Sequence, residues 1–120
     1  MATGRPVVHF EIMGRDGKRL QEFYAALFGW QIDANNPLSY GRVQPGIGGP
    51  VEGVGGGIAS TGDAPPRVSV YVQVVSLEET LEQVQRMGGK TVVRPLDTPG
   101  GPTIAQFADP EGNIIGLVKQ

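Results

Sequence analysis

Two segments of the chain alternate apolar and polar residues, the pattern that predicts a strand with one buried face. They are residues 7–12 and residues 67–74. The apolar face holds Val8, Phe10 and Ile12 in the first segment and Val70, Val72 and Val74 in the second. Because alternate residues of a strand share a face, we expect the polar residues of each segment to point away from the apolar ones. These polar residues are His9 and Glu11 in the first segment and Tyr71 and Gln73 in the second.

An amphipathic helix is predicted to follow each of these strands. The first begins after Asp16, a good N-cap, and stops at Gly29, which accepts a left-handed conformation. The second begins after Ser76, which forms a capping box with Glu79, and stops at a glycine pair. We expect the apolar stripes of both helices to be core: Leu20, Phe23, Tyr24, Leu27 and Phe28 in the first, and Leu77, Leu81, Val84 and Met87 in the second.

Three short strands are predicted after each helix, so the chain holds two copies of one motif. The copies span about residues 5–60 and 67–120, joined by a turn-forming linker at 61–66, within a single domain of residues 1–120. The fold class is therefore α+β, built from two βαβββ modules, and the strand count argues against a ferredoxin-like βαββαβ order. The expected strands are residues 30–33, 40–44 and 56–60 in the first copy, and 90–95, 102–107 and 113–118 in the second.

One helix cannot cover both faces of a four-stranded sheet, so each module leaves one face bare. We expect the two half-sheets to curve into a partly open barrel around a cleft, lined by the polar residues of the two first strands. A concave surface with few polar groups is the usual place for a small-molecule site. The predicted ligand-binding residues are His9, Glu11, Tyr71 and Gln73.

Composition excludes several classes of partner. The net charge is −2 and the ten basic residues are scattered, so we expect neither nucleic acid nor an anionic membrane as a partner. The chain has no cysteine, which excludes disulfides, thiolate metal sites and a cysteine nucleophile and suits a reducing compartment. It has no apolar run long enough for a signal sequence or a membrane span. We therefore expect a soluble, cytoplasmic protein.

Gly116 interrupts an otherwise apolar strand, where a glycine usually marks a bulge or a position at which a side chain has been lost. The segment that contains it, FADPEGNIIGLV, resembles the vicinal oxygen chelate superfamily, as do VVHFEI, FYAALFGWQI, VYVQV and LEETLEQVQRMGGK. This superfamily includes glyoxalase I, extradiol dioxygenases, and the bleomycin and fosfomycin resistance proteins. The resemblance covers nearly the whole chain. It implies paired βαβββ modules around a cleft, usually in a homodimer whose subunits pack together or swap modules.

In the metal-dependent branches, the resemblance implies metal ligands on the first and last strand of each half. His9 matches a ligand position, but Tyr71 stands where the second half would offer histidine and Gly116 where it would offer glutamate. Residues 53–61 supply no carboxylate for the first half. A catalytic divalent metal usually needs three or more nitrogen or oxygen ligands from the protein. We therefore expect no metal and no other cofactor.

Three functions remain open. The first is metal-free binding of a small, partly apolar organic molecule in the cleft. The second is a lyase, isomerase or dioxygenase that acts on a small oxygenated substrate. Such an enzyme would use either a metal held by His9, Glu11 and a third donor such as Tyr71 or Glu52, or acid–base catalysis by His9 and Glu11. The third is a scaffold that only dimerises, in which His9 and Glu11 satisfy each other's hydrogen bonds. The glycine-rich segment 45–57 is a hypothetical lid over the cleft.

Overall fold

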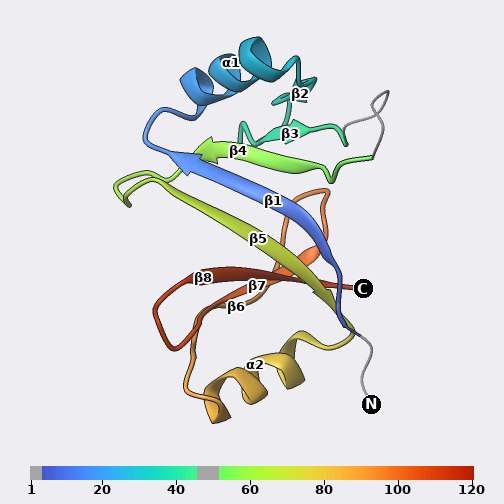
Figure 1. The fold of residues 1–120 in the computed structure, drawn as a ribbon, viewed down its shortest axis with the longest axis vertical. Helices are drawn as coiled ribbons and strands as arrows, with labels where there is room; N and C mark the ends of the chain where they lie inside the picture. Colours follow the sequence, from blue (N-terminus) through green and yellow to red (C-terminus); the bar gives the residue numbers. More distant parts are fainter. Residues whose placement is uncertain (1–3, 46–51) are drawn as a thin grey trace. The chain divides into compact units, whose positions relative to one another are not determined.

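The chain forms two compact units in a computed structural model that describes residues 4–45 and 52–120 (Figure 1). The first-half unit comprises residues 9–68. The second-half unit comprises residues 69–120 together with the N-terminal residues up to Val8. Residues 46–51, which belong to the predicted glycine-rich lid, lie outside the described residues, and the lid stays a prediction.

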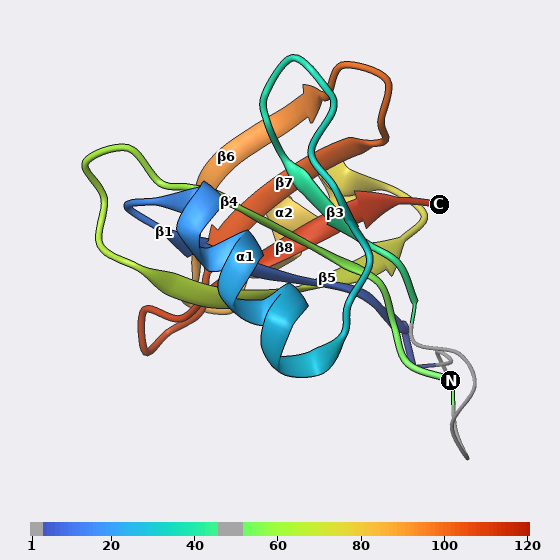
Figure 2. The same cartoon turned by 90° about the horizontal axis from the view of Figure 1, so that it is seen from above.

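The first-half unit follows the predicted order of strand, helix and three strands. Its elements are β1 (Val7–Gly14), α1 (Gly17–Phe28), β2 (Ile32–Asp33), β3 (Gly41–Val43) and β4 (Gly56–Ser60). The strands lie in the order β2-β3-β4-β1, with β1 parallel to β4 and the other pairs antiparallel. Helix α1 packs against β3 and β4, and Figure 2 shows it from above.

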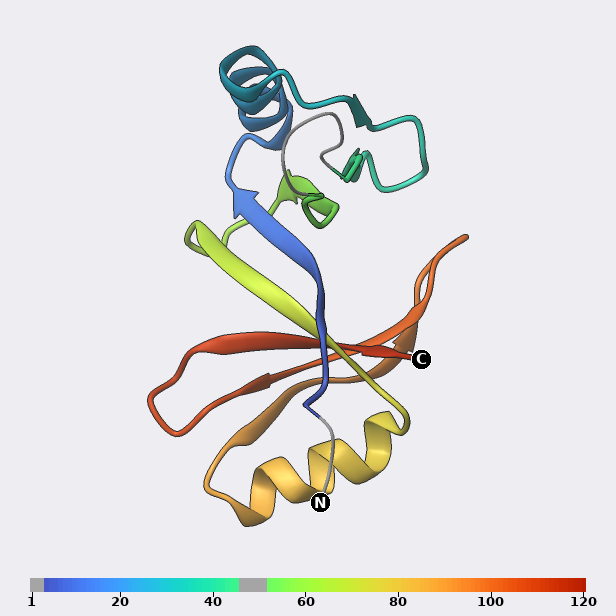
Figure 3. The ribbon, with the colours of Figure 1, turned by 45° about the vertical axis from the view of Figure 1, so that its right-hand side comes forward.

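The second-half unit repeats this arrangement with longer strands. Its elements are β5 (Arg67–Val74), α2 (Leu77–Arg86), β6 (Lys90–Asp97), β7 (Thr103–Ala108) and β8 (Ile114–Lys119). The strands lie in the order β5-β8-β7-β6, and Figure 3 shows α2 along one side of β6, β7 and β8. The hydrophobic core of this unit lies between helix and sheet and consists of Val74, Leu77, Leu81, Ala105 and Leu117.

The predicted starts of both helices and the predicted end of the first are confirmed, whereas α2 ends at Arg86, before the glycine pair that was predicted to stop it. The Asp16 side chain accepts a hydrogen bond from the backbone N–H of Arg19 at 3.1 Å, and Gly29 ends α1 with φ 70°. The Ser76 hydroxyl accepts from the backbone N–H of Glu79 at 3.2 Å. These caps satisfy amide and carbonyl groups that the helix itself leaves unpaired, and so they fix where each helix begins and ends. Neither α1, with 12 residues, nor α2, with 10, is long and apolar enough to cross a membrane.

The expectation that both apolar stripes are core is wrong in part. Leu20 and Tyr24 of α1 are partly buried, but Phe23, Leu27 and Phe28 are 57–59% exposed. Helix α1 rests on β3 and β4, which have only three and five residues, so these strands cover one edge of a broad stripe. In the other helix, the stripe ends early, because α2 stops at Arg86 and leaves the following Met87 exposed.

The α+β architecture with two βαβββ modules is confirmed, and the ferredoxin-like order is excluded because three strands follow each helix within its module. Strands β4 and β5 have the predicted bounds. Strand β2 is shorter than predicted, with two residues, because only Ile32 and Asp33 pair with β3.

Candidate functional site

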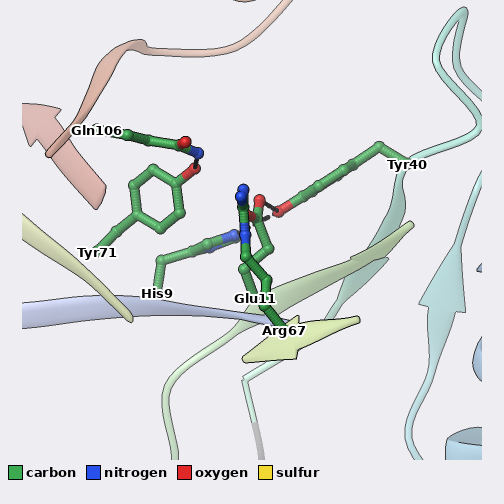
Figure 4. A network of polar contacts seen from close by, with 6 residues as sticks. All are labelled: His9, Glu11, Tyr40, Arg67, Tyr71 and Gln106. Carbon is green, nitrogen blue, oxygen red and sulfur yellow. Dashed lines mark hydrogen bonds and ion pairs between the residues drawn. The ribbon is translucent and has the colours of Figure 1, made fainter. Parts of the chain in front are cut away.

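The polar face of β1 carries a hydrogen-bonded cluster centred on Tyr40 (Figure 4). His9 and Glu11 are two residues apart in β1 and share this face. Nε2 of His9 lies 2.8 Å from the hydroxyl oxygen of Tyr40, and the same hydroxyl donates a hydrogen bond of 3.0 Å to Oε2 of Glu11. These three side chains, which we term the Tyr40 cluster, join the two site residues predicted on the first strand.

The Tyr40 cluster lies on the face of the strand opposite helix α1. On the other face of β1, the Phe10 ring packs against Trp30 with 5.2 Å between ring centroids, and Trp30 stacks on Tyr24 of α1 at 5.7 Å. The apolar side of the strand therefore takes the helix, as predicted. His9 and Glu11 are left on the face that α1 does not cover.

Both the ring and the backbone of Tyr40 are held in place by neighbouring residues. A Cβ atom at Gly57 of β4 would overlap Cζ and the hydroxyl oxygen of Tyr40, so the ring lies over the bare backbone at this glycine. Gly57 is paired in turn with Glu11 of β1. The backbone of Tyr40 is fixed by Asn36, whose Oδ1 accepts from the Tyr40 N–H at 2.9 Å and whose Nδ2 donates to the Tyr40 carbonyl at 2.7 Å. Sequence reasoning missed Tyr40, although the glycine-rich strand beside it was a signal.

Glu11 is buried, with 6% of its surface exposed. Its Oε1 lies 3.8 Å from Nη2 of Arg67 at the start of β5. Burial of a carboxylate is costly unless charge or hydrogen bonds compensate, and Arg67 and Tyr40 supply one contact of each kind. The Arg67 Nε atom is buried as well, and within the described residues no hydrogen-bond partner faces it. Arg67 is a second residue of this face that the sequence did not single out.

His9 is partly buried, and this desolvation lowers the pKa of its imidazole below the ordinary value of 6.5. The ring is therefore uncharged at neutral pH. An uncharged imidazole has one N–H donor and one nitrogen lone pair, so it can both give and accept a hydrogen bond. Together with a phenol and a buried carboxylate, it provides the group types used in general acid–base chemistry and in the recognition of hydroxyl or amide groups.

In the second-half unit, Tyr71 of β5 explains why Gly116 lacks a side chain. The two residues are paired across β5 and β8, and a Cβ atom at Gly116 would lie 2.5 Å from Cγ of the Tyr71 ring. The ring therefore lies over the glycine. Its hydroxyl oxygen accepts a hydrogen bond of 2.9 Å from Nε2 of Gln106 in β7, and both side chains are buried (Figure 4).

The four predicted site residues thus have different surroundings. His9 and Glu11 are joined through Tyr40, whereas the Tyr71 hydroxyl accepts a hydrogen bond from Gln106. Gln73 is partly buried, and its backbone N–H donates to the carbonyl of Pro6 at 2.9 Å. That the residues of the two units line one cleft stays a prediction.

The residues present do not fit the metal centre of the metal-dependent branches. Within residues 4–45 and 52–120, no three histidine, aspartate or glutamate side chains come together. Strand β4 contains no carboxylate, and the place above Gly116 is taken by the Tyr71 ring. His9 and Glu11 alone supply two donors of the three or more that such a centre needs.

The profile of the glyoxalase-like domain family matches residues 9–118 of this chain. Among solved structures, a methylmalonyl-CoA epimerase in complex with methylmalonyl-CoA and NH4+ is 14% identical, with a TM-score of 0.66 over 98% of this chain and 96% of that one. The methylmalonyl-CoA epimerase from Mycobacterium tuberculosis is 16% identical, with a TM-score of 0.62 over 99% and 92% of the two chains.

A glyoxalase/bleomycin resistance protein/dioxygenase superfamily member from Vibrio splendidus 12B01 is also 16% identical, with a TM-score of 0.62 over 98% of this chain and 100% of the other. No curated protein sequence gives a significant match. At these identities, the solved structures show that the fold is shared, and they leave the chemistry to be argued from the residues.

Proposed function

The chain belongs to the glyoxalase-like domain family of the vicinal oxygen chelate superfamily, and on this premise we propose that it binds a small organic molecule, without a catalytic metal, at the Tyr40 cluster. One observation carries the proposal. A single hydroxyl, that of Tyr40, is hydrogen-bonded to both a partly buried histidine and a buried carboxylate, on a sheet face that the unit's own helix leaves uncovered.

The chemistry of the cluster favours a ligand with at least one hydroxyl, amide or other polar hydrogen. The imidazole of His9 is uncharged, and the charge of Glu11 faces that of Arg67. The face therefore recognises a ligand through donors and acceptors rather than through net charge, and charged groups elsewhere on the ligand need not contact it. Among the residues that the structure describes, no third histidine, aspartate or glutamate joins His9 and Glu11, which supports binding without a metal.

The only histidine of the chain provides the test, because its ring signals can be followed by NMR without overlap. Protein labelled with 15N at histidine is titrated with methylmalonyl-CoA, bleomycin and fosfomycin. We expect at least one of these to shift the His9 signals saturably, and Glu11→Gln to weaken that binding about tenfold or more through loss of a charge-assisted hydrogen bond. Tyr24→Phe, which changes a tyrosine on the other face, serves as the control and leaves the affinity unchanged.

The proposal is contradicted if none of the three compounds shifts the His9 signals at millimolar concentration. It is also contradicted if a compound binds with an affinity that Glu11→Gln and Tyr40→Phe leave unchanged, since the molecule would then be held elsewhere on the protein.

Acid–base isomerisation is a second candidate, favoured by the neutral state of His9 next to a hydroxyl and a carboxylate. Two of the three similar structures named above are methylmalonyl-CoA epimerases. In such a reaction, His9 takes the proton of an acidic C–H group, and the electron pair remains on the substrate as an enolate. Water then gives a proton to the other face of the enolate, and His9 passes its proton to the resulting hydroxide, which completes the inversion. Exchange of that proton in D2O, followed by 1H NMR of methylmalonyl-CoA, tests this. Exchange that is abolished by His9→Ala supports an enzyme, and its absence leaves a binding protein.

A further inference from the structure

We infer that Arg67 is a ligand-binding residue of this site and donates hydrogen bonds from its guanidinium group to a neutral carbonyl oxygen of the ligand. The inference rests on the proposed function and deepens it, because it names a second recognition group beside the Tyr40 cluster. It narrows the ligand class to compounds with an uncharged carbonyl group, such as amides, esters, thioesters and ketones.

The guanidinium of Arg67 has donors that the protein does not use. Arginine carries five N–H donors and no acceptor. Within residues 4–45 and 52–120, its side chain makes one polar contact, the ion pair of 3.8 Å between Nη2 and Oε1 of Glu11. This distance is too long for a hydrogen bond, and the buried Nε atom has no hydrogen-bond partner either. The group is therefore attracted to Glu11 while its directional hydrogen bonds remain unmade.

A ligand can reach the terminal nitrogens of this group. Nε is the polar side-chain atom of Arg67 that is both buried and unpaired. Because Nη1 and Nη2 also form no hydrogen bond within the described part of the chain, these two atoms are unpaired but not buried. In agreement, 33% of the side-chain surface is exposed. The guanidinium thus has its Nε side inside the protein and its terminal N–H groups accessible to solvent.

The position of Arg67 is restricted at both ends of the residue. Pro65 and Pro66 come directly before it in the chain, and each proline ring fixes its backbone φ angle. The side chain runs beside that of Glu11 (Figure 4), and attraction to this buried carboxylate limits its freedom. A donor that is already held in place loses less conformational entropy on binding than a freely moving surface arginine.

Glu11 determines which kind of acceptor the guanidinium favours. Its carboxylate is buried and lies 3.8 Å from Nη2, so its negative charge offsets the positive charge of Arg67. An anionic ligand group at the same guanidinium is repelled by Glu11 and loses its own strong hydration. A neutral carbonyl oxygen accepts the same hydrogen bonds at a much smaller cost. The ion pair therefore makes Arg67 a donor for carbonyl groups rather than an anion-binding residue.

Two small probes of nearly equal shape separate these acceptors: acetamide, a neutral carbonyl compound, and acetate, a carboxylate. Each is titrated at constant pH and ionic strength into protein labelled with 15N at arginine and histidine. The Nε–H signal of Arg67, assigned by its loss in Arg67→Lys, and the ring signals of His9 report binding. We expect acetamide to shift both saturably, with a dissociation constant of about 100 mM or less, as four heavy atoms permit. Acetate should bind at least about threefold more weakly.

Variants identify the donor. Arg67→Lys keeps the positive charge opposite Glu11 but loses the planar guanidinium, so we expect it to weaken acetamide binding, followed at His9, at least about threefold. Arg94→Lys makes the same change at an exposed arginine of β6 and leaves the binding unchanged. Urea denaturation shows that each variant is folded. The comparison of the two probes in the wild type needs no variant, so it decides the outcome by itself if Arg67→Lys does not fold.

Three results would each overturn the inference: no saturable shift with acetamide, acetate binding as tightly as acetamide, or acetamide binding that Arg67→Lys leaves unchanged. The proposed function is judged separately, by the three larger compounds at His9. If one of these binds while acetamide binding does not depend on Arg67, only the inference is wrong. If acetamide binds at Arg67 and none of the larger compounds shifts the His9 signals, only the proposed function is contradicted.

Discussion

Replacement of Gly116 by alanine tests how the second-half unit is built. The added Cβ atom would lie 2.5 Å from Cγ of the Tyr71 ring, which is the root of the side chain, so the ring cannot avoid it by a small movement of its tip. Overpacking of this kind costs about 1–3 kcal/mol. Displacement of the ring also breaks the buried bond between Tyr71 and Gln106 and leaves an amide unsatisfied, at about 1–3 kcal/mol.

A smaller opposing term comes from the unfolded chain, because alanine has less conformational freedom than glycine there, worth about 0.4–1 kcal/mol. We therefore expect Gly116→Ala to lower the free energy of unfolding by about 2–4 kcal/mol, measured by urea denaturation. In a Tyr71→Val background, which lacks the ring, the same change should cost less than about 0.5 kcal/mol. Gly4→Ala, at a glycine with open space around it, is the control. An equal cost of Gly116→Ala in both backgrounds would refute the explanation.

Three further predictions concern titration, capping and metal. Because burial lowers the folded-state pKa of His9, the unfolded chain binds a proton at this residue more readily than the folded protein does. The free energy of unfolding should therefore be level above about pH 6.5 and fall as the pH drops below 6.5 toward the lowered pKa. Urea denaturation of His9→Gln should lack this fall, and its persistence there would assign it to other groups. Ser76→Ala should destabilise the protein by about 1 kcal/mol through loss of the bond to Glu79, and Ser76→Thr should restore most of it, whereas equal stability of all three proteins would contradict a role for the cap. Exhaustive treatment with EDTA should leave the thermal unfolding midpoint unchanged, and a fall reversed by one divalent metal would show a structural metal.

Much of the fold could be predicted from local patterns. The alternation around His9 and Tyr71 predicts β1 and β5, and the capping residues Asp16 and Ser76 predict where the helices begin. The exposure of Phe23 and its neighbours could not be predicted, because periodicity shows that a helix has an apolar face but not how much surface is available to cover it. That area depends on the short strands β3 and β4, whose lengths are set by tertiary pairing.

The candidate site was predicted only in part, for a related reason. His9 and Glu11 could be found because their spacing places them on one face of a single strand. Tyr40 lies in an irregular segment, and its role depends on the register that places Gly57 beside Glu11. In the same way, Gln106 reaches Tyr71 because β7, β8 and β5 are paired in register. Such registers are set by the packing of whole strands, so no local pattern reveals them.

The predicted homodimer and cytoplasmic location remain predictions. The exposed apolar residues of α1 allow the dimer prediction to be tested. Replacing Phe23 and Leu27 by polar residues should dissociate a dimer that uses this helix, whereas the mass of a monomer in solution should not change. Sedimentation equilibrium of the wild type and this variant distinguishes the two cases.

The most direct test of the central claim is the crystallographic position of a bound molecule. Crystals soaked with whichever probe binds most tightly are predicted to show it within hydrogen-bond distance, about 2.7–3.2 Å, of a side chain of the Tyr40 cluster, with no metal between them. A probe held only at another surface, or one held through a metal bound to His9, would contradict the account.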